Sequence, residues 1–157
     1  MIDTDPKLRK IALLLKKRAA LPVRRYVDEC LRLHESMPHP QRGQFGRIPD
    51  AILEVNAKES RVAHLRAELL KEKLFLEDVL QEVDDHLRAK YCNYLDRFNK
   101  DTQTATVNNA LRPIARRVKP LANAVMVIDA LLQSMDNHRF SMGGTVKALE
   151  QQSRSAT

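Results

Sequence analysis

Two groups of basic side chains are the residues best placed to do chemistry in this chain. The first group lies within one helical stretch. The second lies in residues 112–119, around Pro113 and before Pro120, with no acidic residue among its four cations. Clustered Lys and Arg attract the phosphates of a nucleic-acid backbone and gain affinity by releasing counterions. We therefore expect both groups to contact nucleic acid. Their members are Lys58, Arg61 and Arg66 in the first group and Arg112, Arg116, Arg117 and Lys119 in the second.

An aromatic ring between two arginines is a further candidate. Phe45 lies between Arg42 and Arg47 in a stretch that also contains Gly43 and Gly46. A ring on a flexible backbone could stack on an unpaired base while the arginines bind phosphates. The alternative is an ordinary apolar side chain that fills space under a loop, and the sequence favours this second interpretation.

Catalytic and metal-binding patterns are weak. The chain contains no P-loop, nucleophile elbow or paired His at metal spacing. Residues 77–85 contain a cluster of five acidic side chains, which we call the acidic cluster. It is more simply a solvated helix face than a metal or catalytic site. Gly143-Gly144 before Thr145 could begin an anion-binding helix, but a turn explains it more simply. We expect no enzyme activity, no metal and no cofactor. The acidic cluster comprises Glu77, Asp78, Glu82, Asp84 and Asp85.

The composition favours an all-α protein that carries no membrane span. Only 4% of the 157 residues are aromatic, there is no Trp, Gly is scarce and 30% of residues are charged. The net charge of +7 is uneven: residues 1–48 have a balance of +6, residues 49–100 of −2 and residues 101–157 of +3. The N-terminus lacks a signal-peptide pattern, and Cys30 and Cys92 lack metal-ligand spacing, which suits reduced thiols. We expect a cytoplasmic protein.

The first expected region is a basic helical pair and loop over residues 1–48. A helix should begin near Asp5-Pro6, because Thr4 or Asp5 can cap it and proline fits the first helical position. Leu21-Pro22 should break it, with a second helix directly after, and residues 37–49 should form a loop. The first helix is basic and amphipathic, so it could pack on the protein, contact phosphates or lie on a membrane surface.

The second expected region, residues 49–157, is organised around a helix over residues 50–98. Apolar residues recur along it at a near-heptad spacing that resembles a coiled coil. After it we expect a polar loop at 99–110, an apolar helix over 120–138, a turn at 137–144, a short helix from Thr145 and a frayed tail. The apolar helix is too short to cover the long one, so we expect a homo-oligomer. Its interface should contain Leu76, Leu80, Val83, Leu87, Leu121, Val125, Ile128 and Leu132.

The C-terminal half resembles the recombination mediator proteins of large tailed phages, the UvsY-like family. The resemblance covers about residues 55–150, in the stretches Lys58–Arg66, Val125–Met135 and His138–Met142, the last of which adds Arg139 to the expected DNA contacts. The chain has Arg-Phe where the family has Arg-Gly-Phe, and residues 5–36 have no clear counterpart. The resemblance implies a ring-forming oligomer that binds single-stranded DNA and helps a strand-exchange recombinase displace single-strand-binding protein. If a phage encodes the chain, it would act in the host cytoplasm.

Two classes of function follow. The first is a DNA-binding recombination accessory protein that loads a recombinase. The second is a non-enzymatic structural or adaptor protein, such as a phage virion or scaffold component, that self-assembles through its apolar helix faces.

Overall fold

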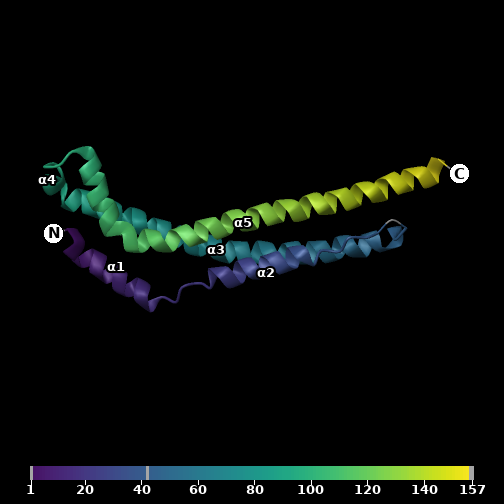
Figure 1. Ribbon diagram of the computed structural model, residues 1–157, viewed down its shortest axis with the longest axis horizontal. Coiled ribbons are helices and arrows are strands. Elements are labelled where there is room, and N and C mark those ends of the chain that lie inside the picture. Colours follow the sequence, from purple (N-terminus) through teal and green to yellow (C-terminus); the bar gives the residue numbers. More distant parts are fainter. Residues whose placement is uncertain (1, 42, 156–157) are drawn as a thin grey trace. The chain divides into compact units, whose positions relative to one another are not determined.

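The protein is all-helical. The structure, a computed structural model, describes residues 2–41 and 43–155 (for Asp3, the backbone alone), and it contains no strand in these residues. The predicted fold class, an all-α chain with a long central helix, is confirmed (Figure 1). The elements in order are η1 (Ile2–Thr4), α1 (Pro6–Lys17), α2 (Val23–Glu35), η2 (Phe45–Arg47), α3 (Ile48–Lys90), α4 (Cys92–Leu95) and α5 (Lys100–Ser155).

The contacts divide the chain into two compact units, and the long helices α3 and α5 contribute to both. Unit 1 contains residues 1–22 and 69–123, and unit 2 contains residues 23–68 and 124–157. Each unit therefore combines one short N-terminal helix with a part of α3 and a part of α5. The expected division at residue 48 is not tested by this grouping and stays a prediction.

In unit 1, α1 packs against the second part of α3 and the first part of α5. Ion pairs Lys7–Glu82 (2.7 Å) and Arg18–Glu72 (2.5 Å) show that α1 and α3 run antiparallel. The core is apolar and comes from all three helices. Its buried side chains include Leu15, Leu69, Leu76, Val83, Leu87, Val107, Leu111, Ile114 and Leu121.

In unit 2, α2 packs with the first part of α3 and the last part of α5. His34 in α2 lies 2.9 Å from the Ser134 hydroxyl in α5, and Arg61 in α3 contacts Glu29 in α2 at 2.9 Å. The buried core again comes from the three helices and includes Cys30, Val55, Val62, Leu65, Ile128, Met135 and Met142.

The start of α1 is as predicted. Asp5 is the N-cap, and its carboxylate accepts hydrogen bonds from the backbone N–H groups of Lys7 (2.8 Å) and Leu8 (3.4 Å). Pro6 is the first helical residue, where a missing N–H costs nothing. The helix ends at Lys17, and α2 begins at Val23 directly after Pro22. These local signals were sufficient to place both helices.

The end of the long helix was predicted wrongly. α3 ends at Lys90 instead of continuing to residue 98, and the single turn α4 follows. The chain then reverses, and Asn99 accepts a hydrogen bond from the Thr102 N–H at 2.9 Å, as a helix cap does. Tyr94 and Phe98, which the expected helix over residues 50–98 would include, instead form an edge-to-face pair in this turn, with ring centroids 5.3 Å apart.

The predicted loop at 99–110, the turn at 137–144 and the separate last helix are also wrong, because α5 is continuous from Lys100 to Ser155. It includes Pro113 and Pro120, and the ribbon of α5 bends in its N-terminal part (Figure 1), as prolines in a helix commonly cause. It also includes Gly143 and Gly144. The described part of the C-terminal tail is helical as well.

The longer α5 changes what covers the apolar stripe of α3. Six of the eight residues expected at a subunit interface are buried within the chain itself, and Leu80 and Leu132 are half-buried. The reason is that α1 and residues 100–121 supply apolar side chains that the predicted 120–138 helix lacked. The interface role of these eight residues stays a prediction, but their burial leaves them little apolar surface to offer another chain. Within the described residues, no helix has a stretch apolar enough to cross a bilayer.

Candidate nucleic-acid interface

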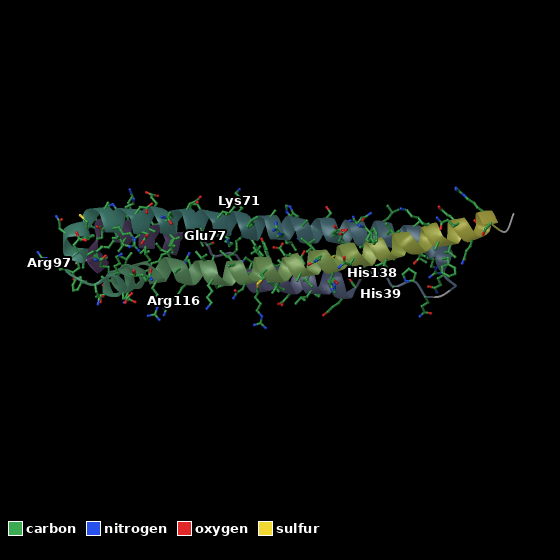
Figure 2. The ribbon with its side chains drawn as sticks, turned by 90° about the horizontal axis from the view of Figure 1, so that it is seen from above. His39, Lys71, Glu77, Arg97, Arg116 and His138 are labelled. Carbon is green, nitrogen blue, oxygen red and sulfur yellow. The ribbon has the colours of Figure 1, made fainter. Side chains whose placement is uncertain are left out.

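Three cations of the predicted second group form a strip on the solvent face of α5 in unit 1. Arg112, Arg116 and Lys119 are all exposed, and their spacing of four and three residues places them on one side of the helix. We call these three residues the basic strip. Arg116 extends away from the ribbon (Figure 2). Arg117 is half-buried beside the strip.

The basic strip has no internal counterion. Within the described residues, none of its members forms an ion pair or a side-chain hydrogen bond. The reason lies in the sequence of α5, which has no Asp or Glu from Thr102 to Ile128. The opposite face of the same turns is apolar, and Leu111, Ile114 and Leu121 hold it in the core of unit 1. The strip is therefore a fixed positive surface that is open to an anionic ligand.

α1 adds to this positive surface. Arg9 lines a hollow of about 240 Å³ together with Asn109, Pro113 and Ile114. It therefore lies beside residues 109–114 of α5, where the basic strip begins. Lys16 and Lys17 near the end of α1 are exposed. The sequence alone did not indicate that α1 and residues 109–114 are neighbours.

Two members of the first predicted group are neutralised inside unit 2. Lys58 forms an ion pair with Glu54 at 2.6 Å and also donates to the Ser36 carbonyl. Arg61 donates to the carboxylate of Glu29 at 2.9 Å. A phosphate would have to compete with these carboxylates, so neither side chain offers a free positive charge.

The same holds for Arg66 and Arg139. Arg66 forms an ion pair with Asp129, and the hydrogen bond to that carboxylate raises the pKa of Arg66 above its usual value. Arg139 contacts Asp136, and it also lies 3.4 Å from the Glu59 carboxylate. These contacts join α3 to α5 in unit 2. The structure thus places the eight predicted DNA contacts in two groups, of which the group on residues 112–119 is free of carboxylates.

Phe45 lies beside a shallow hollow of unit 2. Its side chain is 44% exposed, and the hollow of about 290 Å³ is also lined by His39, His138 and Met142. The two imidazole rings are edge-to-face with centroids 4.6 Å apart, and Figure 2 shows them side by side. Phe45 is thus accessible to a planar ligand, and its role in base stacking stays a prediction. Arg42, its predicted phosphate-binding neighbour, lies outside the described residues.

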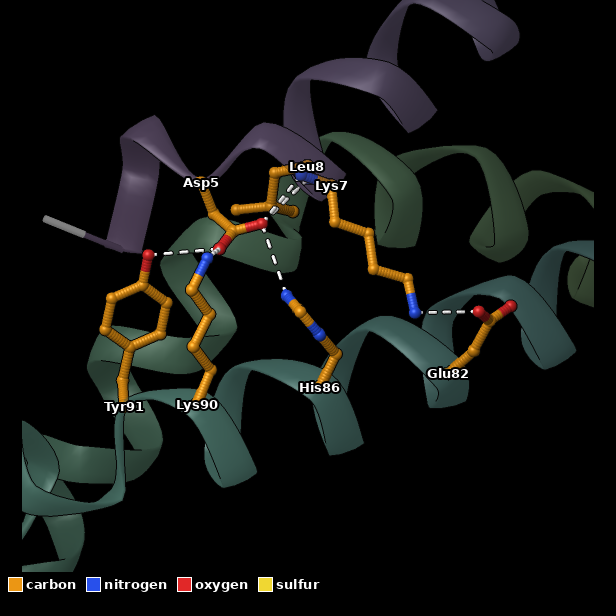
Figure 3. Close-up of polar contacts among 7 residues, drawn as sticks. All are labelled: Asp5, Lys7, Leu8, Glu82, His86, Lys90 and Tyr91. Atoms are coloured by element: carbon orange, nitrogen blue, oxygen red, sulfur yellow. Dashed lines mark hydrogen bonds and ion pairs between the residues drawn. The ribbon is translucent and has the colours of Figure 1, made fainter.

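Among the described residues, Asp5 has the pKa that departs furthest from its ordinary value. The sequence indicated this residue only as a candidate helix cap. Its carboxylate is 1% exposed and accepts hydrogen bonds from Lys90 Nζ (2.7 Å) and the Tyr91 hydroxyl (3.0 Å), and His86 Nε2 lies 3.4 Å away (Figure 3). Burial acts to raise the pKa of Asp5, but the hydrogen bonds from Lys90, Tyr91 and the α1 amides outweigh it and hold the pKa well below its usual value. The site lies between α1 and the end of α3 and has the character of a structural clamp.

The acidic residues of α3 do not converge on a metal site. Asp84 pairs with Arg88 at 2.9 Å, and Glu77 pairs with Lys73 at 2.8 Å, both at a spacing of four residues along the helix. The part of the chain that the structure describes contains no group of three or more His, Cys, Asp or Glu side chains arranged to hold a metal ion.

Comparison with known proteins adds no relative: neither the protein-family models nor the curated proteins nor the solved structures contain a match to this chain.

Proposed function

We propose that this protein is a non-enzymatic accessory protein that binds single-stranded DNA through the basic strip of α5 and assembles as a homo-oligomer. The observation that supports this proposal is the contrast between the two groups of cations. Lys58, Arg61 and Arg66 are occupied by carboxylates of unit 2, whereas the basic strip faces solvent without a counterion in the described residues.

The arrangement suits a flexible, singly stranded ligand. The three cations of the strip span residues 112–119, eight residues of one helix. The length is about 10 Å, since a helix rises about 1.5 Å per residue. Such a strip can track a few successive phosphates of a flexible backbone.

One strip binds weakly, and repetition would make binding strong. Each neutralised phosphate of a single strand contributes about −0.7 to the slope of log K against log salt, so three contacts give a slope of about −2 per chain. Two or more chains on one strand raise the affinity further, because each later contact is intramolecular. This is the physical reason to combine the basic strip with self-assembly.

The test compares two triple variants with the same loss of charge. Arg112→Ala/Arg116→Ala/Lys119→Ala removes the basic strip. The control, Arg25→Ala/Lys71→Ala/Lys147→Ala, removes three exposed cations from elsewhere on α2, α3 and α5. We expect the strip variant to lose most binding to a labelled oligonucleotide, measured by fluorescence anisotropy, and the control to keep it. Equal losses in both variants would show that only net charge matters and would contradict the proposal.

The more specific role is that of a recombination mediator. Support for it comes from the resemblance of residues 55–150 to the UvsY-like family, which implies that recombinase and single-strand-binding protein are partners. The direct assay measures filament formation by a strand-exchange recombinase on DNA that is covered by single-strand-binding protein. The protein should shorten the lag before filament growth, and an unchanged lag would remove this role while leaving DNA binding intact.

A second candidate function is that of a structural or adaptor protein. It is favoured by the large apolar side chains that unit 2 exposes, above all Phe140 at 82%, Leu53 at 67% and Met126 at 66%. Exposed apolar residues of this size suit a protein partner. This candidate predicts stable self-assembly without DNA binding, so the anisotropy measurement separates the two.

A further inference from the structure

An apolar groove in unit 1 is not used by the DNA-binding proposal. It lies between α1 and α3 and has a volume of about 600 Å³. Leu14 and Phe75 line it from opposite helices and are 56% and 40% exposed, although both are large apolar residues. The remaining apolar lining comes from Pro6, Ile11, Leu15 and Val79. Apolar surface that stays exposed in this way commonly marks an interaction site.

Ion pairs close the groove at both ends. Lys7 pairs with Glu82 at 2.7 Å at one end, and Arg18 pairs with Glu72 at 2.5 Å at the other. The Arg18 guanidinium also lies 4.0 Å from the centre of the Phe75 ring. The groove therefore has a defined length of about 16 Å, which is the length of the helical segment from Lys7 to Arg18 at about 1.5 Å per residue.

The two rims of the groove have opposite charge. Lys10 lines the groove from α1 and is exposed. Asp78 is exposed on α3, three residues after Phe75 and four before Glu82, so it lies on the same side of that helix. Neither side chain forms an ion pair or hydrogen bond with another described residue. The groove thus has a basic rim on α1 and an acidic rim on α3, each with an unpaired charge between the two closing ion pairs.

We propose that the occupant of this groove is the same groove of a second copy of the chain. Because α1 and α3 run antiparallel, a two-fold axis parallel to the groove places α1 of each copy over α3 of the other. The apolar linings then face each other, and Lys10 of each copy faces Asp78 of the other. The result is an antiparallel four-helix contact with two equivalent ion pairs, and such an isologous interface closes as a dimer.

A second copy fits this surface better than an unrelated helix does. A single amphipathic helix would have to present acidic residues along one edge and basic residues along the other. The groove face of this chain already has that pattern. The two-fold rotation places each charged side chain opposite one of the other sign on the second copy. The interface specifies the homo-oligomer that the proposed function includes, and it moves the subunit contact from the buried residues Leu76, Val83 and Leu87 to the neighbouring exposed face.

The first experiment compares two adjacent leucines of α1. Leu14→Asp places a charge in the groove, whereas Leu13→Asp is a matched control, since Leu13 is 58% exposed but does not line the groove. Sedimentation velocity over a range of protein concentrations gives the dissociation constant of the dimer, and circular dichroism checks the helix content. We expect Leu14→Asp to raise the dissociation constant about tenfold or more, because each dimer loses two buried leucines. The control should stay close to wild type.

The second experiment exchanges the two rim charges. Lys10→Glu and Asp78→Lys each place like charges opposite each other across the proposed interface, so each alone should weaken the dimer. The double variant Lys10→Glu/Asp78→Lys restores opposite charges and should recover dimerisation. Recovery would be hard to explain by altered folding, since both side chains are exposed. The proposal would be overturned if wild type is a monomer at all concentrations. It would also be overturned if the dissociation constant of the double variant is raised by the product of the two single effects.

The same samples separate this interface from the DNA-binding proposal. If the dimer forms as expected but neither wild type nor any variant binds an oligonucleotide, the proposed function fails and the proposed interface stands. If Leu14→Asp and wild type are both monomers that bind DNA through the basic strip, the interface fails and the DNA-binding proposal stands. A wild-type monomer that captures an amphipathic peptide in the groove would likewise overturn the self-association.

Discussion

Replacement of Asp5 by Ala should release α1 from the rest of unit 1. The Asp5 carboxylate makes three kinds of contact. It caps α1, accepts a hydrogen bond from Lys90 at 2.7 Å and accepts another from the Tyr91 hydroxyl at 3.0 Å. Loss of an N-cap costs about 1 kcal/mol. Loss of hydrogen bonds to a charged group costs about 1.5–3 kcal/mol, and we take the lower part of this range because the Lys90 side chain is 45% exposed and regains water.

The combined cost of about 2.5–3 kcal/mol corresponds to about a hundredfold change in an equilibrium constant. Hydrogen–deuterium exchange with mass spectrometry measures this change locally, because amides of α1 exchange when the helix detaches. We expect about a hundredfold faster exchange for peptides from α1 in Asp5→Ala, with little change in α2, which belongs to unit 2. This readout does not require the two units to unfold together.

Two further variants sharpen the test. Asp5→Asn keeps a cap acceptor but loses the charge, so its exchange should fall between wild type and Asp5→Ala. Asp50→Ala removes an exposed carboxylate from the first turn of α3 and should leave α1 unchanged. If α1 in Asp5→Ala stays within about threefold of wild type, the carboxylate does not hold the helix in place and our account of the clamp is wrong.

Three other predictions concern pH, helix propensity and cysteine chemistry. The pKa of Asp5 in the folded protein lies below its unfolded value of about 3.9. The stability that the carboxylate provides is therefore complete above about pH 3.9 and falls as the pH is lowered toward the folded pKa. Acid titration monitored by hydrogen exchange of α1 should show this loss in wild type and not in Asp5→Ala. Gly144→Ala should stabilise the protein by about 0.5–1 kcal/mol in thermal unfolding, because the glycine is helical and an added Cβ meets open space; a lower melting temperature would contradict the continuous α5. Alkylation of the native protein should label exposed Cys92 quickly and Cys30 only on unfolding, since Cys30 is buried and burial raises the pKa of its thiol; equal labelling of both would refute the packing of α2.

The N-terminal helices were predictable because their signals are local. Asp5-Pro6 is both a cap and a first-turn proline, and Pro22 separates α1 from α2. No tertiary contact was needed to place these starts. The ion pairs at four-residue spacing on α3, such as Lys73–Glu77 and Asp84–Arg88, were predictable for the same reason.

The continuity of α5 was not predictable from composition. Its first part is rich in Thr and Asn, which favour loops on average, yet Asn99 acts as a cap and Thr106 satisfies its hydroxyl by donating to the Thr102 carbonyl at 2.7 Å. Val107 and Leu111 bury one face and stabilise the helix through packing. Packing likewise compensates for Pro113, which alone would cost about 3 kcal/mol in a helix interior.

The state of the basic residues was also hidden from the sequence. Arg61 meets Glu29, and Arg66 meets Asp129, over separations of 32 and 63 residues. No local rule connects such positions, so residues that look like free cations in the sequence can be neutralised in the fold. The basic strip could be identified as a candidate because its surroundings in the sequence contain no acid, but its exposure required the structure.

The most direct test of the central claim is a salt titration of single-stranded DNA binding with wild type and the variant that lacks Arg112, Arg116 and Lys119. We expect log K to fall linearly with log salt for wild type. The slope of the variant should be smaller in magnitude by about 2 per chain, from three lost phosphate contacts at about 0.7 each. An identical slope in the two proteins, or no binding by wild type at low salt, would contradict it.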